Sequence, residues 1–184
     1  MKRPAALLLY ISAVASLCSC SSTPDVKPPL EWGYEKEAIT VTLQGAPQLN
    51  LFQKTPHALV ACLYQLRDPN GFNQFRSEPD GLAKLLECGR FDQGVATAKR
   101  LVIQPGQELT DTLDRAEGAR YVGFVAGYYR LDKERSARLI PIPAVEETKG
   151  FFSRKKTVKP GRLDMKLLLG PQEIQDVTEE TEKP

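Results

Sequence analysis

The segment Ile39-Thr40-Val41-Thr42-Leu43-Gln44 decides the fold class of this chain of 184 residues. Apolar and polar side chains alternate along it, and most of its residues are β-branched. Because successive side chains of a strand point to opposite faces, this period of two predicts a half-buried β-strand. Residues 163–169 repeat the alternation. A strand of the same kind is therefore expected near each end of the folded region.

Strand-like stretches and turn residues alternate between these two segments. The stretch 57–66 is a near-continuous apolar run, which is typical of a central strand covered on both faces. Pro141 and Pro143 cannot donate to a ladder, so the strand that contains them belongs at a sheet edge. The strand-like stretches are residues 57–66, 95–104, 107–113, 119–129 and 137–145. About seven strands with intervening turns predict a mainly β fold, a β-sandwich.

One segment departs from the β pattern. After the turn at residues 68–71, Phe72 and Phe75 lie three positions apart, and leucines follow at 82, 85 and 86. These intervals predict short amphipathic helices, with Asp80 as the candidate N-cap of the second. The sandwich is therefore expected to carry a small helical insert.

The N-terminus has the pattern of a bacterial export signal. Two basic residues precede an apolar run that ends in Leu17-Cys18-Ser19-Cys20. This ending resembles the lipobox of bacterial lipoproteins, so residues 1–19 are expected to be removed and Cys20 to be lipidated. By analogy with bacterial sorting rules, Ser21 favours the inner leaflet of the outer membrane. The alternatives are a plain secretory peptide or a single span, which needs ~20 apolar residues.

Composition sets the remaining boundaries. Residues 20–34 hold three prolines and are expected to form a periplasmic tether, residues 35–175 the sandwich domain, and the charged residues 176–184 a disordered tail. Removal of the signal peptide leaves 23 basic and 23 acidic residues, and this balance does not support a nucleic-acid surface. Residues 151–160 are expected to form a basic loop, from Arg154 to Lys159, at a solvated hairpin tip. A headgroup or partner contact is the alternative.

Two cysteines, Cys62 and Cys88, remain after processing and lipidation. The periplasm is oxidising, so a disulfide between them is expected, and it would contribute ~3.5 kcal/mol in the chain-entropy model. The alternative is that they are two small buried residues that never meet.

Sequence signals for catalysis are weak. His57 is the one histidine of the chain, and neither a Gly-x-Ser-x-Gly elbow nor a Cys-x-x-Cys pair is present. The chain is therefore not expected to be an enzyme, or to need a cofactor or a metal.

In the order of its motifs, the chain resembles the outer-membrane lipoprotein of the type VI secretion apparatus, the TssJ/VasD type. The likeness covers nearly all of the expected mature domain. Neither the cysteine pair nor the basic loop belongs to the resemblance, so their roles stay open. The motifs are the lipobox and tether, Leu49-Asn50, Tyr64-Gln65-Leu66, Phe72 with Phe75, Leu82 to Leu86, Pro105-Gly106 and the run Tyr121 to Ala126.

The resemblance implies a transthyretin-like β-sandwich that holds the periplasmic C-terminal domain of the inner-membrane TssM-type protein at the outer membrane. It also implies that the loop between the first two strands, here residues 46–56, makes the contact. Three side chains of this loop are unusually apolar for a solvated turn, and the alternative is that they cover the open end of the sandwich. The expected partner-binding residues are Leu49, Asn50, Leu51, Phe52 and Gln53.

Two other functions stay open. One is an outer-membrane lipoprotein that binds a carbohydrate or another small ligand through aromatic side chains such as Tyr128 and Tyr129. The other is a chaperone-like factor that assists assembly of an envelope pore.

Overall fold

The computed structural model describes residues 30–149 and 155–180 of the chain. The expected signal peptide, Cys20, most of the tether and Arg154 lie outside the described residues. In chain order the elements are β1 (Glu35–Gly45), β2 (Leu59–Leu66), α1 (Asn70–Ser77), α2 (Gly81–Leu85), β3 (Val95–Ile103), β4 (Glu108–Arg115), β5 (Tyr121–Ala126), α3 (Lys133–Ser136), β6 (Ala137–Pro141), β7 (Ala144–Lys149), β8 (Lys155–Pro160), β9 (Leu163–Leu169) and β10 (Ile174–Glu180).

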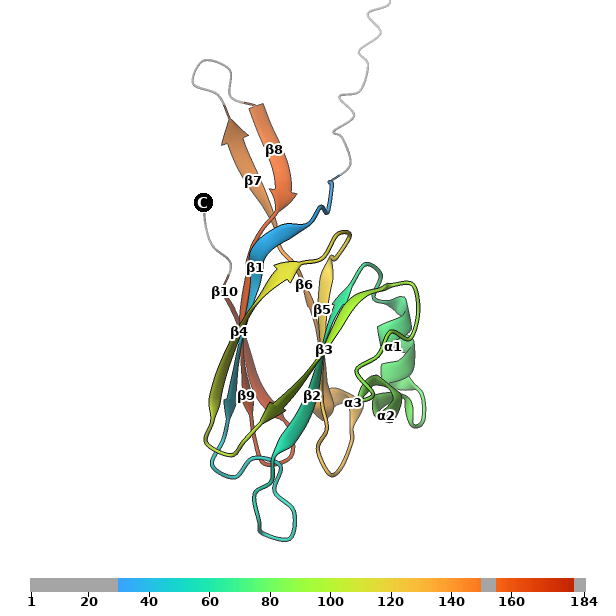
Figure 1. Cartoon of the computed structure of the whole chain (residues 1–184), viewed down its shortest axis with the longest axis vertical. Coiled ribbons are helices and arrows are strands. Elements are labelled where there is room, and N and C mark those ends of the chain that lie inside the picture. The colour runs from blue at the N-terminus through green and yellow to red at the C-terminus, as the bar shows by residue number, and fades with distance from the viewer. Residues whose placement is uncertain (1–29, 150–154, 181–184) are drawn as a thin grey trace, which may run out of the picture.

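Two four-stranded sheets face each other and form a β-sandwich (Figure 1). One sheet has the order β10-β9-β1-β4 and the other the order β3-β2-β5-β6. The two alternating segments of the sequence, β1 and β9, lie side by side as a parallel pair with Val41 opposite Met165. Their apolar faces turn inward together, and the predicted mainly β sandwich is confirmed.

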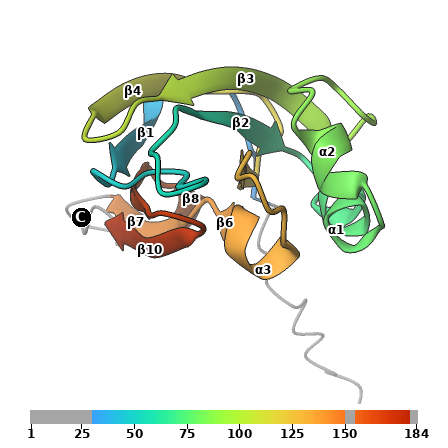
Figure 2. The same cartoon turned by 90° about the horizontal axis from the view of Figure 1, so that it is seen from below.

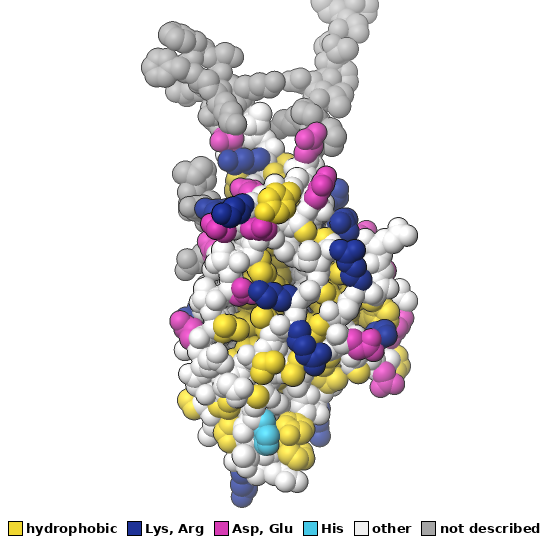
Figure 3. Space-filling model, in the orientation of Figure 1, with side chains coloured by type: hydrophobic (Ala, Val, Ile, Leu, Met, Phe, Trp, Pro, Cys, Tyr) yellow, Lys and Arg dark blue, Asp and Glu magenta, His cyan; other side chains and the backbone are white. Residues whose placement is uncertain are grey.

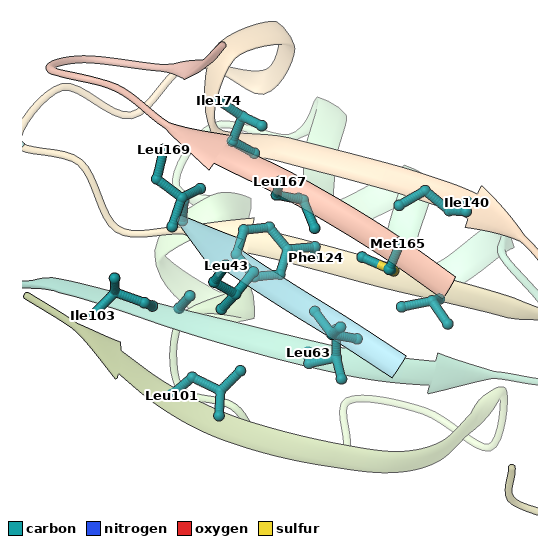
Figure 4. Close-up of a cluster of buried hydrophobic side chains, with 14 of the residues drawn as sticks. Leu43, Leu63, Leu101, Ile103, Phe124, Ile140, Met165, Leu167, Leu169 and Ile174 are labelled. Carbon is teal, nitrogen blue, oxygen red and sulfur yellow. The ribbon is translucent and has the colours of Figure 1, made fainter. Parts of the chain in front are cut away.

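The main core lies between the two sheets (Figure 4). Leu43 of β1 and Leu167 of β9 enter it from the first sheet, and Leu63 and Phe124 enter it from the second, all at most 2% exposed. Burying a side chain of this size stabilises the fold by about 1.5–3 kcal/mol. The alternation of apolar and polar residues thus gives each sheet an apolar face, and the two apolar faces pack together to form the sandwich.

A second, smaller core explains the continuous apolar run of β2. Helices α1 and α2 cover the face of the second sheet that is turned away from the first sheet (Figures 1 and 2). Phe72 and Leu85 pack there against Tyr64, whose hydroxyl donates to the carbonyl of Leu85. Strand β2 is thus buried on both faces, as its composition predicts, and the helical insert is where the leucine spacing places it.

A disulfide joins β2 to the chain that leaves α2. The sulfur atoms of Cys62 and Cys88 are bonded, with their Cα atoms 5.2 Å apart. Asp80 stands at the N-cap position of α2, as predicted, but its side chain makes no capping hydrogen bond and its φ is +60°. The disulfide therefore holds the end of a short helix that lacks a side-chain cap.

Three segments differ from the sequence expectation. The stretch 137–145 divides into edge strand β6 and strand β7, because Pro141 and Pro143 interrupt the ladder. Residues 155–160 of the expected basic loop form strand β8, which pairs with β7 in a separate hairpin. The expected disordered tail is also corrected in part, because residues 176–180 pair with β9 as β10.

A buried arginine fastens the start of β1 to the base of the hairpin. Arg115 is 3% exposed, and its guanidinium lies 2.8 Å from the Glu35 carboxylate. The same guanidinium donates to the carbonyls of Gly33 and Gly161, each at 3.2 Å. Sequence reasoning missed this clamp, because an isolated arginine at a strand end gives no pattern.

Candidate functional site

Three loops meet at the end of the sandwich that lies opposite residue 30 (Figures 1 and 2). They are residues 46–58 between β1 and β2, residues 127–132 after β5, and residues 170–173 between β9 and β10. Backbone hydrogen bonds join the first and third, from the amide of Asn50 to the carbonyl of Gly170 at 3.3 Å and from the amide of Leu51 to the carbonyl of Pro171 at 2.7 Å. The predicted partner loop is therefore held against its neighbours.

A two-residue turn projects the end of the first loop. The backbone groups of Phe52 and Thr55 exchange hydrogen bonds of 3.0 and 2.9 Å. Between them Gln53 and Lys54 have φ of +49° and +66°, as a type I′ turn requires. Residues with a Cβ seldom adopt positive φ, so Gln53 and Lys54 are in a strained backbone conformation. The turn fixes the position of Phe52.

Asn50 connects the first loop to the second. It is 6% exposed and has φ of +46°. Its side-chain nitrogen donates to the carbonyl of Ala58 at 3.2 Å, and its side-chain oxygen accepts from the backbone of Tyr129 at 3.1 Å. Asn50 therefore joins the first two loops from a nearly buried position.

The five residues expected to bind a partner fall into two groups. Leu49 is 0% exposed and packs in the main core, so this side chain is a core residue, as the alternative interpretation held. Leu51 is half-buried, and Phe52 and Gln53 are exposed. The side chains of this loop that reach the surface are therefore those from Leu51 onward, and Leu49 and Asn50 are buried.

An exposed aromatic cluster forms where the first two loops meet. The rings of Phe52 and Tyr129 stack with centroids 4.2 Å apart and planes at 17°. The His57 ring meets Tyr129 edge-on at 5.2 Å. Phe52 is 43% exposed and Tyr129 56%, and Figure 3 shows the histidine beside hydrophobic side chains at this end. We call Leu51, Phe52, His57, Tyr129 and Arg130 the aromatic tip.

The sequence suggested Tyr129 only as an aromatic side chain that could bind a small ligand, and did not join it to the partner loop. The available signal was the pair Tyr128-Tyr129 directly after a buried strand. In such a pair one side chain faces the core and the next faces outward, because the direction alternates. Tyr128 is indeed 4% exposed, and its burial raises the pKa of its hydroxyl, which therefore stays protonated.

The three loops carry charges of both signs. Lys54, Arg130, Asp132 and Glu173 are all exposed, and of these four only Arg130 lines the pocket between the loops. An open pocket of about 360 Å³ lies between the three loops. It is lined by Asn50, Leu51, Phe52, Tyr128, Tyr129, Arg130, Pro171 and Gln172. The site is suited to an apolar group that carries an acidic or polar neighbour.

His57 is flanked by the rings of Phe52 and Tyr129, and its Nδ1 atom makes no hydrogen bond to the described residues. No group of three or more His, Cys, Asp or Glu side chains in residues 30–149 and 155–180 could hold a metal ion. No helix in those same ranges has the length and apolar character to cross a membrane.

Fold and site together define a transthyretin-like β-sandwich with an exposed aromatic tip at one end. The family model described as "Type VI secretion lipoprotein, VasD, EvfM, TssJ" matches residues 37–170. The chain belongs to this family of type VI secretion lipoproteins, which places it among the components of the secretion membrane complex in the cell envelope. A search of the curated proteins finds no match.

Solved structures share the fold. The type VI lipoprotein TssJ1 from Pseudomonas aeruginosa is 19% identical with a TM-score of 0.55, covering 83% of this chain and 98% of that one. Serratia marcescens Lip, a membrane-bound component of the type VI secretion system, is 16% identical with a TM-score of 0.50, covering 79% and 98%. A chain from a structure of a type VI membrane complex is 14% identical with a TM-score of 0.53, covering 77% and 96%.

Proposed function

We propose that this lipoprotein is anchored by Cys20 in the inner leaflet of the outer membrane and holds the periplasmic C-terminal domain of the inner-membrane TssM-type protein through its aromatic tip. The observation that carries the proposal is the position of the tip. It lies at the end of the sandwich opposite the start of β1, the strand that follows the expected tether in the sequence (Figure 1). A domain anchored at Cys20 therefore points the tip away from the membrane.

The composition of the tip supports a protein partner. Aromatic and arginine side chains dominate the centres of protein interfaces, and truncation of one such anchor commonly costs about 2 kcal/mol or more. Phe52 and Tyr129 remain exposed although each could bury apolar area, and Arg130 lies beside them. The hydrogen bonds through Asn50 fix their loops before binding, which lowers the entropy lost on association.

The contact of the two rings argues against the carbohydrate alternative. A sugar binds best on a free aromatic face. Here Phe52 and Tyr129 stack on each other, so each ring covers one face of the other. The pocket is also open and holds no buried acid, so it offers few of the fixed acceptors that sugar hydroxyls need.

Co-purification from solubilised envelopes tests the partner. The full chain should bring down the TssM-type protein, and titration calorimetry should then give the affinity of its periplasmic domain. Phe52→Ala and Tyr129→Ala should each weaken binding roughly thirtyfold. Val102→Ala is the matched control, because Val102 is a similarly exposed apolar side chain (48%) on β3. An equal loss of affinity in the control variant, or no loss of affinity in the two tip variants, would show that the interface lies elsewhere.

A separate experiment tests the anchor. Cys20→Ser should abolish incorporation of labelled fatty acid and release the protein from the outer membrane. Ser21→Asp should divert the acylated protein to the inner membrane on a sucrose gradient. Label retained in the Cys20→Ser protein, or found on Cys18, would contradict the assignment of Cys20.

A further inference from the structure

The chain that leads into the sandwich is not fastened by a regular ladder until Ile39. The register of β1 with β4 places Glu35 opposite Arg115 and Ile39 opposite Leu113, so three residues of β1 face one residue of β4. The pairing of β1 with β9 also begins only at Ile39. We call residues 32–38 the entry segment. Side chains rather than strand pairing must therefore hold most of it.

Residues at the end of β4 and just after it hold the entry segment. The Asp114 carboxylate accepts hydrogen bonds from the Tyr34 hydroxyl at 2.5 Å and from the Glu37 amide at 2.9 Å. The amide of Gly118 donates to the carbonyl of Trp32 at 2.5 Å. Glu37 has φ of +52°, a strained conformation for a residue with a Cβ. Contacts with one short stretch of chain thus keep the entry segment in a strained path.

The Arg115 clamp is the buried part of this attachment. Its guanidinium lies 2.8 Å from the Glu35 carboxylate and donates to the carbonyl of Gly33 at 3.2 Å. It also donates to the carbonyl of Gly161, which lies between β8 and β9. Arg115 is only 3% exposed, so loss of the Glu35 charge would remove the counter-ion of a buried cation, which is strongly destabilising. One side chain therefore joins the entry segment to two other parts of the sandwich.

We propose that the Arg115 clamp carries the mechanical load that reaches the domain through the Cys20 anchor. The inference rests on the proposed function, because such load arises only in a domain held between a membrane anchor and a partner. The start of β1 and the aromatic tip lie at opposite ends of the sandwich, so the load would run through the whole domain (Figure 1).

The order of attachment along the chain makes the clamp the critical point. The entry segment lies between Cys20 and the regular ladder, so load from the anchor reaches the clamp first. Beyond Ile39, β1 is paired on both sides, with β4 and with β9. Load along β1 stresses these hydrogen bonds together, whereas the entry segment depends on a few side chains. The clamp therefore breaks before the ladder, and its lifetime under load sets that of the anchored domain.

Constant-force spectroscopy on the mature chain, expressed from Cys20 without its lipid, tests the proposal along two load paths. In the first, handles are attached to the Cys20 thiol and to Gln53→Cys, in the exposed turn beside the aromatic tip. In the second, Cys20→Ser and Pro184→Cys move the first handle to the C-terminus. Load then enters through β10, an edge strand, and bypasses the entry segment. The disulfide between Cys62 and Cys88 keeps their sulfurs from reacting with the handles.

Two variants weaken the clamp. Along the first path, E35Q and R115M should each shorten the lifetime of the folded domain about tenfold or more, because each removes one charge of the clamp. Along the second path, the same changes should alter the lifetime less than about twofold, since β10 detaches from β9 before the clamp is loaded.

D111N is the matched control. It breaks the ion pair of 2.6 Å between Lys99 and Asp111, which joins β3 and β4 outside the entry segment. It should therefore change the lifetime less than about twofold along either path. Circular dichroism reports whether each variant is folded, and E35Q alone decides if R115M is not.

Unchanged lifetimes along the first path would overturn the proposal. Equal shortening along both paths would also overturn it, because the clamp would then stabilise the fold without bearing load from the anchor. Neither result would affect the proposed function, which the co-purification and acylation experiments test separately. Failure of those experiments would instead reject the proposed function and, with it, the load that this inference requires.

Discussion

The ring of Phe52 stacks on the ring of Tyr129, with centroids 4.2 Å apart and planes at 17°. The two residues come from different loops, one before β2 and one after β5. Neither loop could present a flat aromatic surface of this size alone. The stack also ties the predicted partner loop to a second loop that sequence reasoning had left out of the site.

A double-mutant cycle on the partner affinity measures this dependence. Phe52→Ala removes one ring and leaves Tyr129 without its stacking partner, so the two changes should not be additive. Aromatic pairs contribute ~0.5–1.5 kcal/mol beyond their buried area, and the coupling free energy should fall in this range. Calorimetric titration of the two single variants and the double variant gives the value. Additive losses would show that the rings contact the partner independently.

The backbone angle of Asn50 gives a second prediction. Asn50→Ala should destabilise the fold by about 2–4 kcal/mol, because the carbonyl of Ala58 and the amide of Tyr129 lose their partner and alanine disfavours positive φ. Asn50→Gly loses the same hydrogen bonds without the Cβ strain, so it should be about 1 kcal/mol more stable than Asn50→Ala. Urea unfolding compares the two. If Asn50→Gly were no more stable than Asn50→Ala, the positive φ at this position would be contradicted.

Much of the fold follows from the sequence, because its signals are local. The alternation of apolar and polar residues along β1 and β9 indicates strands with one buried face. The continuous apolar run of β2 indicates a strand with both faces buried. The spacing of phenylalanines and leucines predicts the helical insert. The hairpin was harder to predict, because three of the six residues of β8 are lysines and Thr157, Val158 and Lys159 are not buried. Residues 155–160 form a strand because they pair with β7, and this pairing cannot be inferred from the local sequence pattern.

The site was predicted only in part, for a similar reason. Loop apolarity does not separate Leu49, which turns into the core, from Phe52, which turns outward. The left-handed turn at Gln53 and Lys54 makes that difference, and neither residue is a typical left-handed one. Tyr129 and the Arg115 clamp depend on contacts between distant segments. Contacts of this kind produce no regular spacing of residues in the sequence, so they cannot be inferred from it.

The disulfide gives a third prediction. The native protein, alkylated without reductant, should show no mass added at Cys62 and Cys88. Loss of the bond through the double change C62A/C88A should lower the free energy of unfolding by about 3.5 kcal/mol, given a sequence separation of 26 residues. The loss should concentrate in α2, because the bond holds the helical insert to β2. Hydrogen exchange of α2 against β1 measures this. Two alkylated thiols in the native protein would reject the bond.

Tyr64 gives a fourth prediction, on alkaline pH. Burial raises the pKa of the Tyr64 hydroxyl from 10.0 to about 12, and burial raises the pKa of Tyr128 as well. Between pH 10 and 12 the unfolded chain releases the Tyr64 proton while the folded protein keeps it. The stability from this group is thus complete below pH 10 and is lost as pH rises toward 12. Urea unfolding at a series of pH values should show the decline.

Tyr64→Phe separates this titration from packing. The variant should lose about 1 kcal/mol at neutral pH, because the carbonyl of Leu85 loses its donor. Above pH 10 its stability should fall less steeply than that of the wild type, so the two curves converge. Val125→Ala is the control, because it removes buried apolar volume from the same small core without a titrating group. It should lower the whole curve and leave its slope unchanged. Parallel curves for Tyr64→Phe and the wild type would show that the buried hydroxyl does not set the alkaline limit of this fold.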